Sequence, residues 1–359
     1  KLKTKEEGGG QAAVVFNGSP LFTGDAGGGE SKIRRWILEN DLLDAIVALP
    51  EKLFFNTGIS TYFWIFSTKK STDRKNKVML VDARTIRTQL RKNLGEKRYE
   101  ISDENAKEIL RHYTENKNTD QVKIFNTTDF AYRQITIQRP LRLKFEITQE
   151  KNEILRSALG LDIEQAKTRV ADAKDQEKEV SGSVLALPGI SMRKGSENNL
   201  LIVEGICKTF DELVGKKWMD RAKFIADLKI ASKKYTGGIP GKAILKTILK
   251  TVGERDEEAE ICLDDAGKQE ADNELKDYER VSWGMDVNEY FKKEVLPYAS
   301  DAWIDESVRD EKDGEIGIVG YEIPFTRFFY RYEEPRKGEE IEKEVRAVED
   351  KIRELFKKI

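Results

Sequence analysis

Two phenylalanines lie in a short segment whose neighbours can place them on a loop. The segment, Leu53–Gly58, lies between two apolar runs, Asp44–Leu49 and Thr61–Phe66. Each run has the length and composition of a buried strand. A loop that joins two such strands and ends in glycine can hold Phe54 and Phe55 at a sheet edge, where an aromatic ring can stack on a flat ligand. The alternative is that both rings plug the end of a core.

A strongly basic segment follows, and it can bind phosphate groups. Within fifteen residues that hold one acid, Glu96, it contains Arg84, Arg87, Arg91, Lys92, Lys97 and Arg98. The spacing of Arg84, Arg87 and Arg91 predicts that these three share one face of a helix. Phosphate binding by this segment predicts a steep salt dependence, whereas a solvated helix face is the alternative.

Further along the chain, Arg133 lies in an alternating segment beside two aromatic residues, Phe130 and Tyr132. Cations interleaved with aromatic rings can contact a nucleic-acid backbone. The same alternation is equally typical of the two faces of a strand.

The sequence contains no complete catalytic constellation. His112 is the only histidine, which excludes a site with two histidine ligands, and a Ser/His/Asp triad would lack its GxSxG elbow. The segment Thr236–Ala243 fails the phosphate-loop pattern because Ala243 follows Lys242. We therefore expect neither a metal site nor a catalytic residue in this chain.

Composition sets the broad class of the protein. The chain has 359 residues, of which 38% are hydrophobic and 36% charged, with a net charge of -2. This length favours about two domains. No run approaches the roughly 18 apolar residues of a membrane span, and no secretory signal is visible. Cys207 and Cys262 lie far apart without a CxxC spacing, so we expect a cytoplasmic protein with no membrane partner.

The order of the expected elements predicts a sheet followed by a charged helical region. Gln11–Phe16 is expected to form a strand, and the following helix is expected to have Ile33, Trp36 and Ile37 on its apolar face. Only one crossover helix precedes consecutive strands, so the sheet should become antiparallel at this end. The composition of residues 150–282 is charged and helical.

The end of the chain carries a heptad pattern. Apolar residues with spacings of four and three predict a helix with one apolar seam, formed by Ile341, Val345, Val348, Ile352, Leu355 and Ile359. A seam of about three repeats is marginal alone, so this helix needs a partner helix within the chain or outside it.

Long strings of the sequence resemble one known family. The segment AAVVFNGSPLFTGDAGGGESKIRRWILENDLLDAIVALPEKLFFNTGISTYFWIF is similar to the later half of the catalytic domain in modification subunits of type I restriction-modification systems. The likeness continues through VMLVDAR, TTDFAYRQITIQRPLRL, PYASDAWIDE and GYEIPFTRFFYRYEEPR to the final heptad helix. Members of this family are DNA adenine methyltransferases that use S-adenosylmethionine.

The resemblance implies an α/β fold. It implies the late, partly antiparallel portion of a class I methyltransferase sheet with a basic extension in residues 1–149, then the charged helical region in residues 150–282 and a C-terminal docking region in residues 283–359. Family members bind S-adenosylmethionine through a glycine-rich loop and hold the adenine amine with an (N/D)PP(F/Y) loop. Neither motif occurs here, and the chain begins at Lys1, so we expect a pocket centred upstream and no activity from this chain alone.

The resemblance also implies roles for particular residues. Phe54 matches an aromatic that packs on the flipped base in related adenine methyltransferases, and a one-residue shift in alignment would assign that role to Phe55. The implied partners are double-stranded DNA, a specificity subunit that docks on the Ile341–Ile359 seam, a second modification subunit and a restriction subunit. Two rival hypotheses are a non-enzymatic DNA-binding or assembly module and a methyltransferase acting on a small molecule or a protein.

Overall fold

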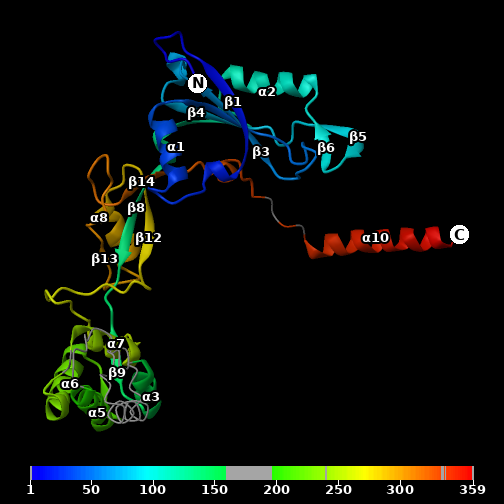
Figure 1. Ribbon diagram of the computed structural model, residues 1–359. Coiled ribbons are helices and arrows are strands. Elements are labelled where there is room, and N and C mark those ends of the chain that lie inside the picture. The colour runs from blue at the N-terminus through cyan, green and yellow to red at the C-terminus, as the bar shows by residue number, and fades with distance from the viewer. Residues whose placement is uncertain (1, 159–195, 239–240, 333–334, 336, 358–359) are drawn as a thin grey trace, which may run out of the picture. The chain divides into compact units, whose positions relative to one another are not determined.

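The computed structural model describes residues 2–158, 196–238, 241–332, 335 and 337–357 (Figure 1). The chain divides into two compact units. The first unit comprises Lys1–Gln134, Arg280–Met285 and Arg309–Ile359, and the second comprises Ile135–Glu279 and Asp286–Val308. The chain passes from the first unit to the second within strand β8 (Ala131–Gln138). No helix in the described parts is long and apolar enough to cross a membrane.

The first unit is built on a five-stranded sheet with the order β1-β3-β2-β4-β7. The strands are β1 (Gln11–Asn17), β2 (Leu43–Ala48), β3 (Thr61–Ser67), β4 (Lys77–Asp82) and β7 (Val122–Asn126). Only the β2–β4 pair is parallel, and the other three pairs are antiparallel. The predicted α/β class with a partly antiparallel sheet is therefore confirmed.

Strand β2 lies in the middle of this sheet and is buried along its whole length. Its alternate side chains enter two separate cores, because successive residues of a strand face opposite sides of a sheet. Ile46 packs with Trp64 and Phe325 on one face, whereas Val47 packs with Val81 on the other, where helix α2 (Asp103–Glu115) adds Ile109. This burial on both faces explains why the strand reads as a continuous apolar run.

Helix α2 is also tied to the sheet through a polar contact. The hydroxyl of Tyr113 donates a hydrogen bond of 2.5 Å to the buried carboxylate of Asp44. Burial and this carboxylate raise the pKa of Tyr113 to about 12. The guanidinium of Arg74 lies 4.4 Å from the Tyr113 ring centroid and 3.3 Å from Asp44.

Helix α1 (Gly29–Glu39) turns an unexpected face to the core. The predicted apolar face was wrong for Ile33 and Trp36, which are 61% and 57% exposed, whereas Arg34 is buried. The Arg34 guanidinium replaces hydration with hydrogen bonds to backbone carbonyls. It donates to the carbonyl oxygens of Pro20, Thr23, Gly24 and Tyr321.

The next residue of α1 forms a buried ion pair. Arg35 donates to both carboxylate oxygens of Asp310, at 2.6 and 3.1 Å, and also to Glu39. The Asp310 side chain is 1% exposed and accepts the backbone N–H of Val319 at 2.9 Å. Although burial opposes ionisation, these donors hold the pKa of Asp310 far below its usual value. The pair joins α1 to the segment that precedes strand β14 (Ile318–Tyr321).

A hairpin occupies much of the basic segment. The predicted helical face of Arg84, Arg87 and Arg91 was wrong, because residues 88–100 form strands β5 (Thr88–Leu94) and β6 (Lys97–Glu100). Gly95 and Glu96 form the two-residue turn, and Gly95 has a φ of +60°. A glycine at the first turn position is typical of a two-residue hairpin connection.

The second unit contains the charged helical region. Phe145 stacks on Phe224 at a ring-centroid distance of 4.7 Å in a core that also holds Phe210 and Ile248. The helices are α3 (Gln149–Ala158), α5 (Ser196–Leu213), α6 (Arg221–Thr236) and α7 (Lys242–Val252), and the small sheet is formed by β9 (Leu143–Glu146), β10 (Lys217–Trp218) and β11 (Gly253–Arg255). Later elements are β12 (Asp277–Ser282), β13 (Trp303–Ile304), α8 (Val287–Tyr290) and a π-helical turn (Phe291–Val295).

The predicted heptad helix is present as α10 (Gly338–Phe356). Its apolar seam is exposed, with Ile341 at 46%, Val348 at 57% and Leu355 at 58%. No residue in the described part of α10 is buried. Ile359, the last predicted member of the seam, lies outside the described residues. Docking on this seam stays a prediction.

Candidate nucleic-acid interface

The aromatic loop, residues 49–60, joins the neighbouring strands β2 and β3 at one edge of the sheet. Phe54 is 36% exposed and Phe55 is 62% exposed. The alternative that both rings plug a core is therefore wrong. An isolated backbone bridge pairs Phe54 with Thr57, so the loop folds back on itself at its tip. The tip of the loop is a tight turn from which two aromatic rings reach the solvent.

The β5–β6 hairpin docks on this aromatic loop through the backbone (Figure 1). The N–H of Glu96 donates to the carbonyl oxygen of Phe55 at 2.9 Å, and the N–H of Arg98 donates to that of Lys52 at 2.8 Å. A third, longer contact of 3.4 Å joins the N–H of Tyr99 to the same Lys52 carbonyl. Two segments that are separate in the sequence, the aromatic loop and the basic hairpin, therefore form one surface.

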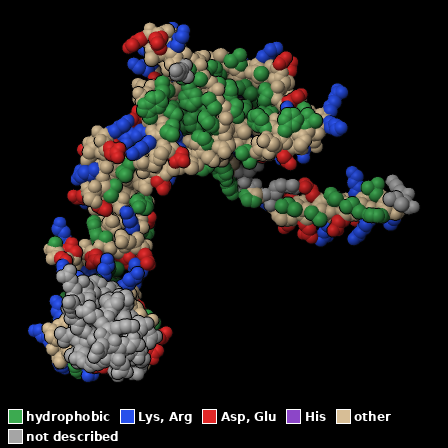
Figure 2. All heavy atoms as spheres, in the orientation of Figure 1, with side chains coloured by type: hydrophobic (Ala, Val, Ile, Leu, Met, Phe, Trp, Pro, Cys, Tyr) green, Lys and Arg blue, Asp and Glu red, His purple; other side chains and the backbone are tan. Residues whose placement is uncertain are grey.

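The hairpin cations lie around the aromatic rings of this surface. The Lys97 ammonium lies 5.6 Å from the Phe55 ring centroid, and the Arg87 guanidinium lies 3.8 Å from that of Tyr99. Arg91 and Lys92 are exposed, and neither forms an ion pair with any residue that the structure describes. Figure 2 shows Lys and Arg side chains projecting at this end of the first unit. Cations on a hairpin that contacts an exposed ring can bind phosphates while the ring stacks on a base.

The remaining candidate cations have partners within the protein. Arg84 forms two hydrogen bonds of 2.7 Å with the carboxylate of Asp82, which raises the pKa of the guanidinium. Arg133 forms an ion pair of 2.5 Å with Asp313, and its side chain is 13% exposed. Arg98 is bound more loosely, because it donates to the Gly95 carbonyl and pairs with no described carboxylate. Arg84 and Arg133 would have to leave these carboxylates before they could neutralise a phosphate.

Several members of this surface escaped the sequence prediction. Ile59 and Leu94 are 55% and 45% exposed, and Tyr99 provides the ring beneath Arg87. The available signal was Gly95, which can open a two-residue turn, but the flanking runs contain few β-branched or aromatic residues. No sequence signal predicted that the hairpin turn would contact the aromatic loop.

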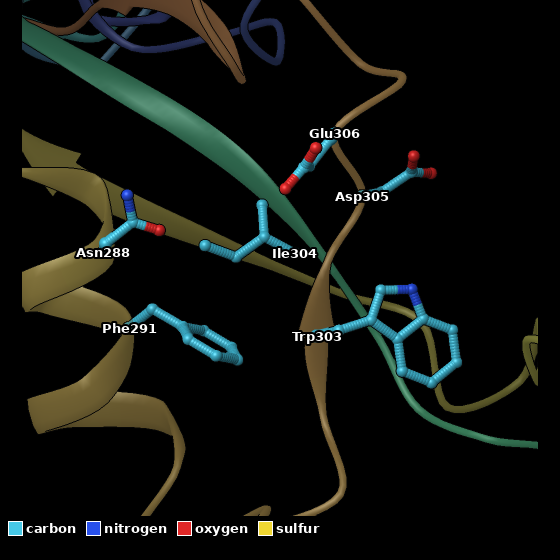
Figure 3. Close-up of a pocket in the computed structure, with 6 residues that line it drawn as sticks. All are labelled: Asn288, Phe291, Trp303, Ile304, Asp305 and Glu306. Carbon is cyan, nitrogen blue, oxygen red and sulfur yellow. The ribbon is translucent and has the colours of Figure 1, made fainter. Parts of the chain in front are cut away.

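A separate cavity of about 470 Å³ lies in the second unit. Figure 3 shows Asn288 and Phe291 facing Ile304 and Glu306, whereas the side chains of Trp303 and Asp305 point away. One amide and one carboxylate beside a ring form neither an acid–base pair nor a metal-ligand set. We assign no reaction to this cavity.

In the part of the chain that the structure describes, the glycine-rich segment before α1 is not an open cradle for S-adenosylmethionine. Added side chains at Gly27 and Gly28 would approach Ile318 at 3.2 Å and the Asp25 carbonyl at 3.0 Å, and only Gly29 of this run faces open space. The sequence has eight prolines, none adjacent to another, so it has no (N/D)PP(F/Y) motif. These residues do not fit the cofactor.

Comparison with known proteins finds a family match in the first part of the chain. The sequence model of the N-6 DNA methylase family matches residues 2–135. The match ends where the second unit begins, at Ile135.

The relatives that the chain matches are methylase subunits of type I restriction enzymes, the family expected from the sequence. The MjaVIII methylase subunit of Methanocaldococcus jannaschii is 33% identical over 110 residues, which are 31% of this chain and 18% of that protein. The HindI methylase subunit of Haemophilus influenzae is 42% identical over 57 residues, 16% of this chain and 12% of that protein. The matched part thus spans less than a fifth of these relatives, and the family prediction is confirmed.

Solved structures of such subunits overlap locally. A type I restriction-modification methyltransferase subunit from Streptococcus thermophilus is 28% identical, with a TM-score of 0.28, and the overlap covers 33% of this chain and 23% of that one. The EcoKI M protein is 29% identical, with a TM-score of 0.23, over 29% of this chain and 21% of that one.

Proposed function

We propose that this chain is part of a modification subunit that transfers a methyl group from S-adenosylmethionine to the exocyclic amine of adenine in double-stranded DNA. The observation that supports this most is the joined surface of the aromatic loop and the β5–β6 hairpin, which lies within the segment that matches the N-6 DNA methylase family. An adenine amine inside a duplex is reached only when the base leaves the stack. An exposed ring beside phosphate-binding cations suits that task.

In this proposal each part of the surface has one role. Phe54 packs on the flipped adenine, and Phe55 takes that role if the register differs by one residue. Stacking contributes about 1 to 3 kcal/mol per base, which offsets part of the few kcal/mol that base flipping costs. The main phosphate contacts are made by Arg87, Arg91, Lys92, Lys97 and Arg98. Arg84 and Arg133 contribute less, because each is paired with a carboxylate of the protein.

We further propose that other residues of the subunit hold the cofactor, because the residues present here do not fit it. The 359-residue chain alone should then transfer no methyl group. The test incubates the chain with DNA and S-adenosylmethionine carrying a labelled methyl group. Label in DNA above a no-enzyme blank would contradict this part of the proposal.

The role of Phe54 is tested in the assembled modification complex. Phe54→Ala should slow labelled-methyl incorporation at least tenfold while the melting temperature stays unchanged, because the ring is on an exposed loop. Phe22→Ala is the matched control, because Phe22 is 55% exposed outside the aromatic loop. If Phe54→Ala leaves the rate of methyl incorporation unchanged and Phe55→Ala lowers it, the base-stacking role belongs to Phe55.

The same proposal gives α10 a partner. We propose that its seam packs against helices of a specificity subunit, in a cytoplasmic complex that can include a second modification subunit and a restriction subunit. An exposed apolar stripe on a charged helix is the pattern of a helix that awaits another helix. The site that is methylated would then be chosen by another polypeptide.

A non-enzymatic DNA-binding or assembly module is the second candidate function. The observation that favours it is the absence of a fitting cofactor site in the described residues. The two candidates differ in the assembled complex, because salt-sensitive DNA binding without any methyl incorporation would favour the module.

A further inference from the structure

The β5–β6 hairpin holds the aromatic loop at two points, through its turn at Phe55 and through strand β6 at Lys52. The hairpin donates backbone N–H groups to the carbonyls of Lys52 and Phe55, and the Glu96 carboxylate reaches to within 3.8 Å of the position of a side chain at Gly58. Lys52 has a φ of +55°, which is uncommon for a residue other than glycine. The loop therefore keeps an unfavourable backbone conformation whose carbonyl the hairpin binds.

Gly95 makes this contact possible. A Cβ atom at this position would lie 2.6 Å from the carbonyl oxygen of Phe55, closer than Cβ atoms approach a backbone oxygen in proteins. The obstacle is backbone, so no side-chain rotation relieves it. The same Phe55 carbonyl accepts the N–H of Glu96, the residue after Gly95. Any side chain at position 95 must push the turn and the loop apart.

We infer that Gly95 is a positioning residue, which lets the hairpin turn fix the backbone at Phe55 so that the rings and the hairpin cations meet DNA as one rigid surface. This inference rests on the proposed function for its DNA partner, but the contact itself is independent of DNA. A preorganised loop loses less conformational freedom on binding, so fixing it strengthens stacking without adding a contact.

The first arm of the test measures the contact without DNA. Gly95→Ala is compared with Gly267→Ala, because Gly267 also has a positive φ, +78°, but an added Cβ meets nothing within 4 Å. Hydrogen exchange is followed by mass spectrometry in the full chain. We expect the amides of residues 96–99 to exchange at least tenfold faster in Gly95→Ala and at the wild-type rate in Gly267→Ala. Unchanged exchange in Gly95→Ala would overturn the inference.

The second arm measures binding to two DNA duplexes, one fully paired and one with a single adenine opposite an abasic site. A protein that stacks on an extruded adenine prefers the second duplex, because that base is already unpaired. We expect Gly95→Ala to reduce this preference about fivefold or more, the size of a lost stacking contact, with Gly267→Ala unchanged. A preference that survives in Gly95→Ala despite faster exchange would also overturn the inference.

A double variant separates positioning from loss of stability. If Gly95 acts by positioning the stacking ring, Gly95→Ala adds nothing to the effect of Phe54→Ala on the preference, whereas independent effects multiply. Multiplied effects would therefore contradict the inference. If the wild-type chain shows no preference and no salt-sensitive binding, the proposed DNA function fails, while the exchange arm still decides whether Gly95 holds the aromatic loop.

Discussion

The aromatic loop and helix α10 both expose apolar side chains, but only the loop is held by the rest of the protein. Phe55 is 62% exposed and Val348 is 57% exposed, so exposure alone does not distinguish them. The backbone at Phe55 accepts a hydrogen bond from the hairpin, whereas no residue in the described part of α10 is buried. A held ring is ready for a ligand, whereas a seam without a partner needs a second helix.

The largest expected effect concerns the scaffold of the first unit. Asp310→Asn should lower the free energy of unfolding by about 3 kcal/mol, because it removes the charge that pairs with Arg35 in a buried site. The control is Asp313→Asn. The Asp313 side chain pairs with Arg133 but is 34% exposed, so removing its charge should lower the free energy of unfolding by about 1 kcal/mol or less. Denaturant unfolding measures both. Equal losses of unfolding free energy in the two variants would mean that burial does not strengthen the ion pair between Arg35 and Asp310.

The same pair sets a pH dependence. The folded-state pKa of Asp310 is depressed, so its stabilisation is fully present above the unfolded-state pKa of about 3.9. The stabilisation is lost as pH falls from about 5 through that value toward the folded pKa. Unfolding midpoints of wild type and Asp310→Asn should therefore converge as pH falls below 4. A constant difference between the two unfolding midpoints down to pH 2 would contradict the depressed pKa of Asp310.

The next largest effect is expected in the seam of α10, where a charged substitution tests whether the helix needs a partner. Ile352→Asp should reduce retention of a specificity subunit at least thirtyfold, about 2 kcal/mol, because a charge would enter a helix interface. The isolated chain should keep its melting temperature, since Ile352 is 47% exposed. Ala347→Asp places the same charge off the seam and should bind normally. A drop in melting temperature with Ile352→Asp would show that α10 already packs within this chain.

The third effect is expected in the aromatic loop, whose backbone the hairpin holds. Phe54→Ala should weaken DNA binding by about 1 to 3 kcal/mol, because a ring on a fixed backbone stacks with little loss of freedom. Fluorescence anisotropy with a labelled duplex measures the affinity, and Phe22→Ala serves again as the control, because Phe22 is an exposed phenylalanine outside the aromatic loop. Equal, small changes in both variants would remove the distinction between the aromatic loop and any exposed phenylalanine.

The smallest effect separates phosphate contacts from stacking. Replacing Arg91 and Lys92 with glutamine should lower the slope of log affinity against log salt by about 2, roughly one for each lost phosphate contact. The preference for an unpaired adenine should stay. A control replaces Lys3 and Lys5, which are exposed on the N-terminal segment. An unchanged slope would remove these two cations from the DNA contact.

The strands, the exposed aromatic loop and the final helix were predictable from local pattern. Apolar runs of strand length flank Phe54 and Phe55, and the heptad spacing continues for several turns. The family followed from long strings around these elements. None of these predictions required knowledge of a distant contact.

The errors arose where long-range contacts override local pattern. Arg84, Arg87 and Arg91 have helical spacing, yet the Gly95 turn closes a hairpin whose strands pair with each other. In α1, Arg34 is buried because carbonyls from distant segments bind it, which turns Trp36 to solvent. The joining of hairpin and aromatic loop is likewise a contact between segments about 40 residues apart.

The way the second unit leaves and rejoins the first has a consequence for protein engineering. The chain departs after Gln134, and Gln134 is paired with Ile318 across the β8–β14 ladder after the chain has returned. The second unit is made of two segments, Ile135–Glu279 and Asp286–Val308, and pairing next to the first departure lets their lengths change at little cost, because the entropy cost of loop closure grows only slowly with loop length. The second unit is thus a place where an engineer can exchange a module while the segment that matches the methylase family stays intact.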